Sequence, residues 1–270
     1  MTVRALLASP LGLLIGLSLG ALGGGGSILA VPALVYAAGQ SPKEATSTSL
    51  VLVAITAVIG IVPHWRAGRV RVVPGLLFGL AGIGGSLLGS AWNERVDQDV
   101  LLLAFAGLML VAAWAMWRRV QRSTERTPPT PLAVGAAVAT PHHRTDTTTV
   151  VKVLLAGSLV GLLTGFFGVG GGFVIVPALV LALRFTMTEA AATSLLVIAI
   201  NAVVALGSRL DGGALDWAAI VPFTIASLIG VVIGGRLVGR VDANRLQRWF
   251  VFLLVAVALY TAGSSLVALT

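Results

Sequence analysis

Two glycine-rich segments are the part of this sequence best suited to hold a ligand. The first runs from Gly23 to Gly26 and the second from Gly168 to Gly172, and each interrupts a long apolar stretch. In a lipid environment, backbone groups freed by such a break must be satisfied by protein or by a water-lined cavity. A helix that restarts after the break directs free N–H groups and a partial positive charge into that space, which favours an anion. Close helix packing is the alternative role for these glycines.

Hydroxyl side chains follow each break at corresponding positions. Such hydroxyls can back-bond their own helix, or they can donate to an oxyanion together with the helix amides. Asn201 lies a little over one turn beyond the second hydroxyl pair and near the same face, although lone polar residues in membrane helices also serve as interhelical bonds. The predicted substrate-binding residues are Gly23, Gly24, Gly25, Gly26, Ser27, Thr48, Ser49, Gly168, Gly170, Gly171, Gly172, Phe173, Thr193, Ser194 and Asn201.

Two carboxylates, Glu44 and Glu189, stand just before these hydroxyls. Each is a candidate to carry a proton through the membrane. Each also stands three residues after Ser41 or Thr186, which is the spacing of a capping box at the start of a helix. The pattern favours the cap and leaves proton coupling open.

The two breaks belong to an internal duplication. A Val-Pro-Ala-Leu tetrapeptide follows each glycine run, and its prolines are separated by 177 − 32 = 145 positions. The same offset matches Glu44 to Glu189, and it holds without a gap for roughly ninety residues. The chain therefore consists of two homologous halves.

Composition places both halves in a membrane. The chain is 57% hydrophobic and only 10% charged, whereas soluble domains carry about 25% charged residues. The net charge of +8 resides in short loops and one linker, which is the pattern of the positive-inside rule and not of a nucleic-acid surface. The lipid bilayer is thus the expected partner, with no nucleic acid, and a homodimer is compatible with the sequence.

Each half contains five apolar runs, and the second run of each is short. About twelve residues span roughly 18 Å, against about 30 Å of hydrocarbon, so each short run is predicted to be a half-helix, re-entrant or paired in a hairpin. The total is eight to ten segments. The runs are 5–22, 27–38, 45–63, 74–92 and 100–117, then 150–167, 173–184, 190–207, 217–235 and 246–268.

Loop charges predict that the halves have opposite orientations. Loop 64–73 carries three arginines and should be cytoplasmic, whereas its counterpart 209–218 is net acidic and should face outside. An inverted-topology repeat of this kind is typical of secondary transporters. We therefore predict an all-α polytopic integral membrane protein with Gly-broken half-helices, made of repeat 1 (1–117), a cytoplasmic linker (118–149) and repeat 2 (150–270).

Enzyme chemistry finds little support. The chain has no cysteine and three histidines, two of them adjacent in the linker, so no metal-ligating cluster is predicted within the segments. The glycine runs lack the Lys-Ser/Thr ending of a phosphate loop and the strand–turn–helix setting of a dinucleotide fold. We expect no cofactor, no metal and no catalytic residue.

The Gly-rich Val-Pro-Ala-Leu signature, clearest from Gly168 to Leu179, and the Ala-Thr-Ser-Leu at 192–195 resemble the sulfite exporter TauE/SafE family, also called the toluene sulfonate uptake permease family. The resemblance implies a permease of the bacterial cytoplasmic membrane for small sulfur-containing anions such as sulfite, sulfonates or sulfoacetate, with protons as a candidate coupling ion. The first copy departs at Ser27 and Ile28, which stand where the second has Gly172 and Phe173. The alternatives to a permease are an anion channel and a membrane-embedded assembly factor or enzyme without transport activity.

Overall fold

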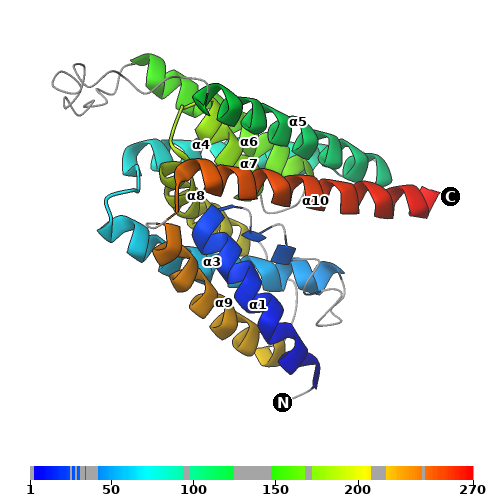
Figure 1. The fold of residues 1–270 in the computed structure, drawn as a ribbon. Coiled ribbons are helices and arrows are strands. Elements are labelled where there is room, and N and C mark those ends of the chain that lie inside the picture. Colours follow the sequence, from blue (N-terminus) through cyan, green and yellow to red (C-terminus); the bar gives the residue numbers. More distant parts are fainter. Residues whose placement is uncertain are drawn as a thin grey trace.

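The computed structural model describes residues 3–24, 26–27, 29–30, 34, 42–93, 98–124, 147–167, 172–207, 217–238 and 241–269. Within these ranges the chain is helical and contains no strand (Figure 1). The helices are α1 (Val3–Leu22), α3 (Pro42–Arg66), α4 (Val72–Asn93), α5 (Gln98–Thr124), α6 (Thr147–Phe167), α7 (Gly172–Leu181), α8 (Met187–Gly207), α9 (Trp217–Leu237) and α10 (Ala243–Leu269). The prediction of an all-helical protein is confirmed.

The helices follow the apolar runs, with extensions into the polar flanks. Helix α7 has ten residues, about 15 Å at the usual rise per residue, so the predicted short helix is present in the second half. Helix α3 continues to Arg66, three residues beyond the apolar run that ends at 63. Helix α5 continues to Thr124, so the first seven residues of the predicted linker are helical. The short run 27–38 lies largely outside the described residues.

The outer surface of the helices is apolar, which makes this a multi-pass membrane protein. Leu87 is 68% exposed and Leu155 is 67% exposed, and similar side chains cover the outward faces of the long helices. By length and composition, four helices in the described part of the chain can cross a membrane: Thr48–Arg66, Val72–Gly89, Met187–Val204 and Ala243–Gly263. Such a surface is stable in hydrocarbon and would aggregate in water.

Two close-packed seams join the halves to each other. Helix α1 packs along α9, and α4 packs along α6; α1 and α9 lie side by side in the lower part of Figure 1. In both seams the contacts advance together along the two helices, so the partners run parallel. The contacts are Gly12 with Phe223, Gly16 with Ser227 and Gly20 with Val231 in one seam, and Gly157 with Phe78, Gly161 with Gly82 and Gly165 with Ser86 in the other.

Small residues explain how these backbones approach so closely. A Cβ added at Gly16 would overlap the backbone of Ser227, and one added at Gly161 would overlap the backbone of Gly82. Ser227 also donates a hydrogen bond of 2.9 Å from its Oγ to the carbonyl of Gly12. Small residues at such interfaces are what van der Waals packing in a membrane requires, because lipid provides no hydrophobic drive between helices.

Corresponding helices of the two halves that meet each other run in opposite directions. Gly60 of α3 contacts Leu195 in the middle of α8, and Arg71, five residues after the end of α3, pairs with Glu189 at the start of α8. Likewise Gln247, near the start of α10, donates a 2.9 Å hydrogen bond to the carbonyl of Met116, in the second half of α5. Helices α3 and α8 therefore pack antiparallel, as do α5 and α10.

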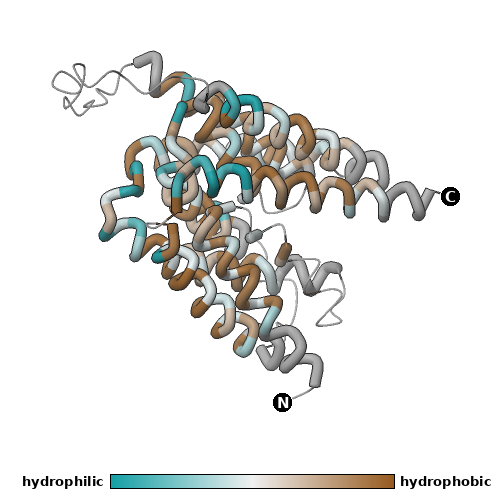
Figure 2. Tube along the Cα trace, viewed as in Figure 1, coloured by the Kyte–Doolittle hydropathy of each residue, from teal (hydrophilic) through white to brown (hydrophobic). Residues whose placement is uncertain are grey.

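Several helix ends that carry positive charge lie together at one end of the molecule. The end of α3 contacts the end of α9 through Pro63 and Gly235, and the start of α4 contacts the start of α8 through Arg71 and Glu189. In Figure 2 hydrophilic residues gather at this end, on the α3–α4 connection and the start of α10, while the middle of the helices is hydrophobic. This end carries the loop 64–73 that the sequence predicts to be cytoplasmic.

Candidate functional site

The first glycine break turns the chain sharply at the end of α1. Gly23 has a φ of +68°, the left-handed conformation that ends many helices and that glycine adopts without strain. A Cβ at this position would also meet the hydroxyl of Ser194 and stand 2.8 Å from the Cα of Ala191. Both the turn and its contact with the first half of α8 therefore require glycine.

The two glycine breaks meet in the interior. A Cβ added at Gly24 would overlap the backbone of Gly172 and stand 2.9 Å from the amide nitrogen of Phe173, at the start of α7. Ser27 also lies against Gly172, since a Cβ on Gly172 would reach the Ser27 hydroxyl. Ser27 and Gly172 are corresponding positions of the duplication (172 − 27 = 145). The structure thus brings Gly23, Gly24, Ser27, Gly172 and Phe173 together.

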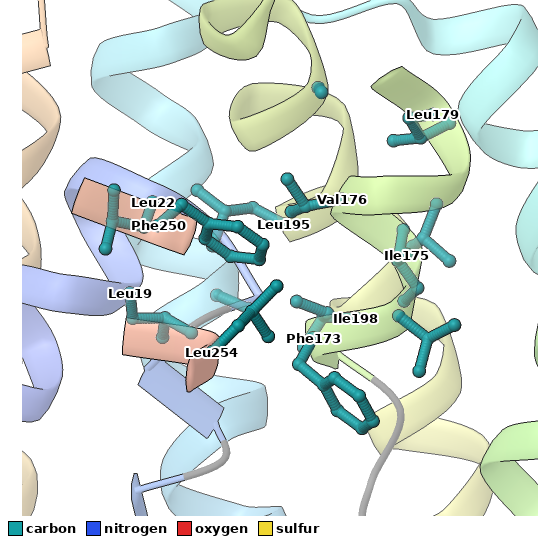
Figure 3. Close-up of a cluster of buried hydrophobic side chains, with 14 of the residues drawn as sticks. Leu19, Leu22, Phe173, Ile175, Val176, Leu179, Leu195, Ile198, Phe250 and Leu254 are labelled. Atoms are coloured by element: carbon teal, nitrogen blue, oxygen red, sulfur yellow. The ribbon is translucent and has the colours of Figure 1, made fainter. Parts of the chain in front are cut away.

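Apolar side chains surround this meeting point. Phe173 is 2% exposed, and its ring packs edge-on against Phe105 of α5, with centroids 4.8 Å apart. Figure 3 shows Val176 of α7 beside Leu195 of α8, with side chains of α1 and α10 in the same cluster. The labelled members are Leu19, Leu22, Phe173, Ile175, Val176, Leu179, Leu195, Ile198, Phe250 and Leu254. A charge placed here would interact strongly with backbone dipoles, because water is excluded.

The hydroxyl residues are buried, and two of the serines bond to their own backbone. Thr48, Ser49, Thr193 and Ser194 are all at most 6% exposed. The Ser194 Oγ donates to the carbonyl of Ala191 over 2.8 Å, and the Ser27 Oγ donates to the carbonyl of Gly24 over 2.7 Å. Of the two open alternatives, back-bonding is what these two serines do here. Their lone pairs stay available, but their protons are committed to the chain.

Thr193 and Asn201 face a different partner from Ser194. The Thr193 Oγ1 accepts a 3.1 Å hydrogen bond from the backbone N–H of Arg71, and its methyl group faces Gly75 of α4. Asn201 lies opposite Gly82 of the same helix, and its Oδ1 is buried without a hydrogen-bond partner. These two residues therefore line the α4 side of α8, while Ser194 lines the side of the glycine break.

Glu189 forms the predicted capping box. Its carboxylate accepts hydrogen bonds of 3.1 Å from the backbone N–H and the hydroxyl of Thr186, and its own N–H donates to the Thr186 hydroxyl over 3.3 Å. In addition it forms an ion pair with Arg71, whose Nε and Nη2 both donate to one carboxylate oxygen, at 3.0 and 2.6 Å. The pair links the α3–α4 loop to the start of α8.

Several predicted residues lie outside the described part. They are Gly25, Gly168, Gly170 and Gly171, and the side chain of Glu44. The described residues contain no group of three or more His, Asp or Glu side chains placed to hold a metal ion.

His64 is the residue that the sequence analysis missed. The apolar run ends at position 63, so hydropathy alone assigns His64 to the loop 64–73. Because α3 continues to Arg66, His64 instead lies in the last turn of the helix and is fully buried. Its Nε2 stands 3.0 Å from the carbonyl oxygen of Gly20, near the end of α1. The absent side chain of Gly235 on α9 leaves room for the ring, since a Cβ there would stand 3.3 Å from the same nitrogen.

Comparison with known proteins gives one consistent result. The family model described as Sulfite exporter TauE/SafE matches residues 8–261. A probable membrane transporter protein of Xylella fastidiosa is 34% identical over 269 residues, covering 98% of each chain. The probable membrane transporter protein YunE of Bacillus subtilis is 24% identical over 275 residues, covering 99% of this chain and 96% of that one. No solved structure matches the chain.

Proposed function

Because the chain belongs to the sulfite exporter TauE/SafE family, we propose that it is a secondary transporter that moves small sulfur-containing anions by alternating access. Sulfite is the anion that the family description names, and we propose sulfonates and sulfoacetate beside it because they carry a similar sulfur oxyanion; the bacterial cytoplasmic membrane is the proposed location. A role as a membrane transporter agrees with the names of the relatives, which are probable membrane transporter proteins.

The observation that carries this proposal is the contact between the two glycine breaks. Gly24 touches the backbone of Gly172 at the start of α7, and the first N–H groups of any helix have no partner within the helix. An oxyanion at this point would receive backbone N–H donors and the positive end of the α7 dipole. The surrounding apolar side chains would strengthen these interactions by excluding water.

The packing of the halves supports alternating access. Helices α3 and α8 occupy corresponding positions in the duplication and pack antiparallel, with Gly60 against Leu195. Two halves in opposite orientation can exchange conformations with each other. One arrangement then opens the central site to one side of the membrane, and the exchanged arrangement opens it to the other side. The seams α1–α9 and α4–α6 each contain one helix from either half, so we propose that each seam moves as one rigid body.

A matched pair of glycine variants tests the site. Gly24→Ala adds a methyl group that overlaps the backbone of Gly172, whereas Gly84→Ala adds the same group where nothing lies within 4 Å. The purified variants would be reconstituted in liposomes, and uptake of sulfite, methanesulfonate, sulfoacetate and, as a comparison, acetate would be measured. We expect the wild type and Gly84→Ala to transport the sulfur anions in preference to acetate, and Gly24→Ala to lose this transport while still inserting into membranes.

Three results would contradict the proposal in different ways. Undiminished transport by Gly24→Ala would exclude the glycine contact as the site. Flux that rises in proportion to anion concentration without saturating would indicate a channel. Absence of anion flux in the wild type under every imposed gradient would indicate an assembly factor or an enzyme.

A further inference from the structure

His64 is a buried ionisable residue that the proposed anion site does not use. Its side chain is fully enclosed at the end of a membrane-spanning segment, between Gly20 of α1 and Gly235 of α9. Ionisable groups within membrane segments are costly and usually mark ion or proton pathways. Gly20 lies three residues before the turn at Gly23, so the ring contacts the last turn of the helix that leads into the first break.

The hydrogen bond to Gly20 identifies the protonation state of each ring nitrogen. A carbonyl oxygen can only accept, so the Nε2 of His64 must carry a hydrogen and donate it over 3.0 Å. In the neutral ring the other nitrogen, Nδ1, then holds a lone pair. Nδ1 is buried and has no hydrogen-bond partner. The ring therefore offers one vacant acceptor, which is a place for a proton.

The charges around His64 are positive. Arg66 follows it on α3, Arg69 lies in the next loop with its N–H bonded to the His64 carbonyl, and Arg236 lies in the last turn of α9. Positions 10–22 of α1 carry no charged residue, and Glu189 of α8 is paired with Arg71. A proton added to the ring would thus face like charges, unless an anion came close to it.

A cavity beside His64 has room for that anion. It measures about 490 Å³ and is lined by Pro63, Arg69, Ile233, Gly235, Arg236 and Leu237. Pro63 precedes His64 in the chain, and Gly235 stands against its ring. Two of the lining residues are arginines, and a guanidinium group suits an oxyanion.

We propose that an anion in this cavity and a proton on Nδ1 of His64 bind together, which makes His64 the proton carrier of the transporter. The proposal rests on the transport function proposed above. The negative charge of the anion offsets the repulsion between the protonated ring and the arginines, so each ligand favours the other by the same factor. The proton moves from water to the Nδ1 lone pair, and Nε2–H keeps its bond to Gly20.

The first test measures coupled fluxes in liposomes that contain a trapped pH dye. We expect an imposed gradient of methanesulfonate to drive proton uptake in the wild type, since this anion keeps its charge throughout the working pH range. His64→Gln retains an amide N–H for the Gly20 carbonyl but cannot be protonated. It should move methanesulfonate with proton uptake lost to the level of empty liposomes. The matched control, His142→Gln with His143→Gln in the linker, should couple as the wild type does.

Equal proton uptake in His64→Gln and the wild type would overturn the assignment of His64. Anion flux in the wild type without proton flux would overturn it as well, while leaving the transport function intact. Absence of anion flux in the wild type would instead remove the transport function on which the inference rests.

A second measurement reads the ring directly and does not depend on a variant at position 64. In the linker double variant His64 is the one remaining histidine of the chain, so ring-labelled protein gives a single set of imidazole signals. We expect added methanesulfonate to shift the titration of these signals to higher pH, and Arg236→Gln to reduce that shift. Arg248→Gln, an exposed arginine of α10, should leave it unchanged. A titration that does not respond to the anion would overturn the proposal.

Discussion

The α4–α6 seam contains two facing glycines that should respond differently to the same substitution. A Cβ added at Gly161 would overlap the carbonyl oxygen of Gly82 and stand 2.6 Å from its Cα. A Cβ added at Gly82 would stand 3.5 Å from the carbonyl oxygen of Gly157 and 3.9 Å from the Cα of Gly161, which are ordinary contact distances. Gly161→Ala should therefore disrupt the seam, and Gly82→Ala should not.

The expected magnitude follows from these distances. Ordinary contact begins at 3.4 Å, so at Gly161 the helices must separate by at least 3.4 − 2.6 = 0.8 Å. Overpacking by one methyl group costs about 1–3 kcal/mol, and the upper end applies because backbone atoms cannot rotate away. Replacing glycine by alanine in a helix returns about 1 kcal/mol. We therefore expect Gly161→Ala to lower the free energy of unfolding by about 2 kcal/mol and Gly82→Ala to raise it by up to about 1 kcal/mol.

The assay is reversible unfolding in mixed micelles as the fraction of denaturing detergent increases, followed by circular dichroism. The two variants should differ by about 3 kcal/mol, a factor of about 150 in the folding equilibrium. Gly84→Ala, on the same helix with nothing within 4 Å of its Cβ, controls for the change in helix propensity. Equal stability of Gly161→Ala and Gly82→Ala would refute the seam geometry.

Two further predictions concern polar contacts. The side chains of the Arg71–Glu189 ion pair are 45% and 23% exposed. A double-mutant cycle with Arg71→Gln and Glu189→Gln should therefore give a coupling energy below about 1 kcal/mol. A larger value would mean that the pair is more enclosed than the structure shows. The Thr224 hydroxyl is buried without a partner, whereas Gln247 donates to the Met116 carbonyl. Thr224→Val should therefore leave the free energy of unfolding equal or higher, while Gln247→Leu should lower it by about 1 kcal/mol. Unfolding in mixed micelles measures both variants, and the reverse order of stability would contradict these hydrogen-bond assignments.

Local patterns predicted the elements well because each depends on residues close in sequence. Most apolar runs matched the helices to within a few residues, and the length of the run 173–184 indicated a helix as short as α7. The Thr186–Glu189 spacing predicted the capping box that α8 contains. The ends of helices were less accurate, since α3 and α5 continue into polar sequence that hydropathy alone assigns to loops.

The candidate site was predicted in part. The duplication implied that the two glycine breaks are related, and the contact of Gly24 and Ser27 with Gly172 brings them together. Helical spacing did not separate Thr193, which faces α4, from Ser194, which faces the first break. His64 was missed because its burial depends on two helices, α1 and α9, that are distant from it in sequence.

The sequence by itself determined that this chain is duplicated, helical and suited to a membrane. Composition, the hydropathy of successive residues and the repeated motifs are all properties of the sequence alone. Only the tertiary structure decided which helices pair. The glycines at positions 12, 16 and 20 indicate that another helix packs closely against α1. The neighbouring residues do not identify that helix as α9 of the other half. Pairing depends on whether the backbones of two distant segments fit each other without overlap. That fit between the halves brings the two breaks into contact and encloses His64.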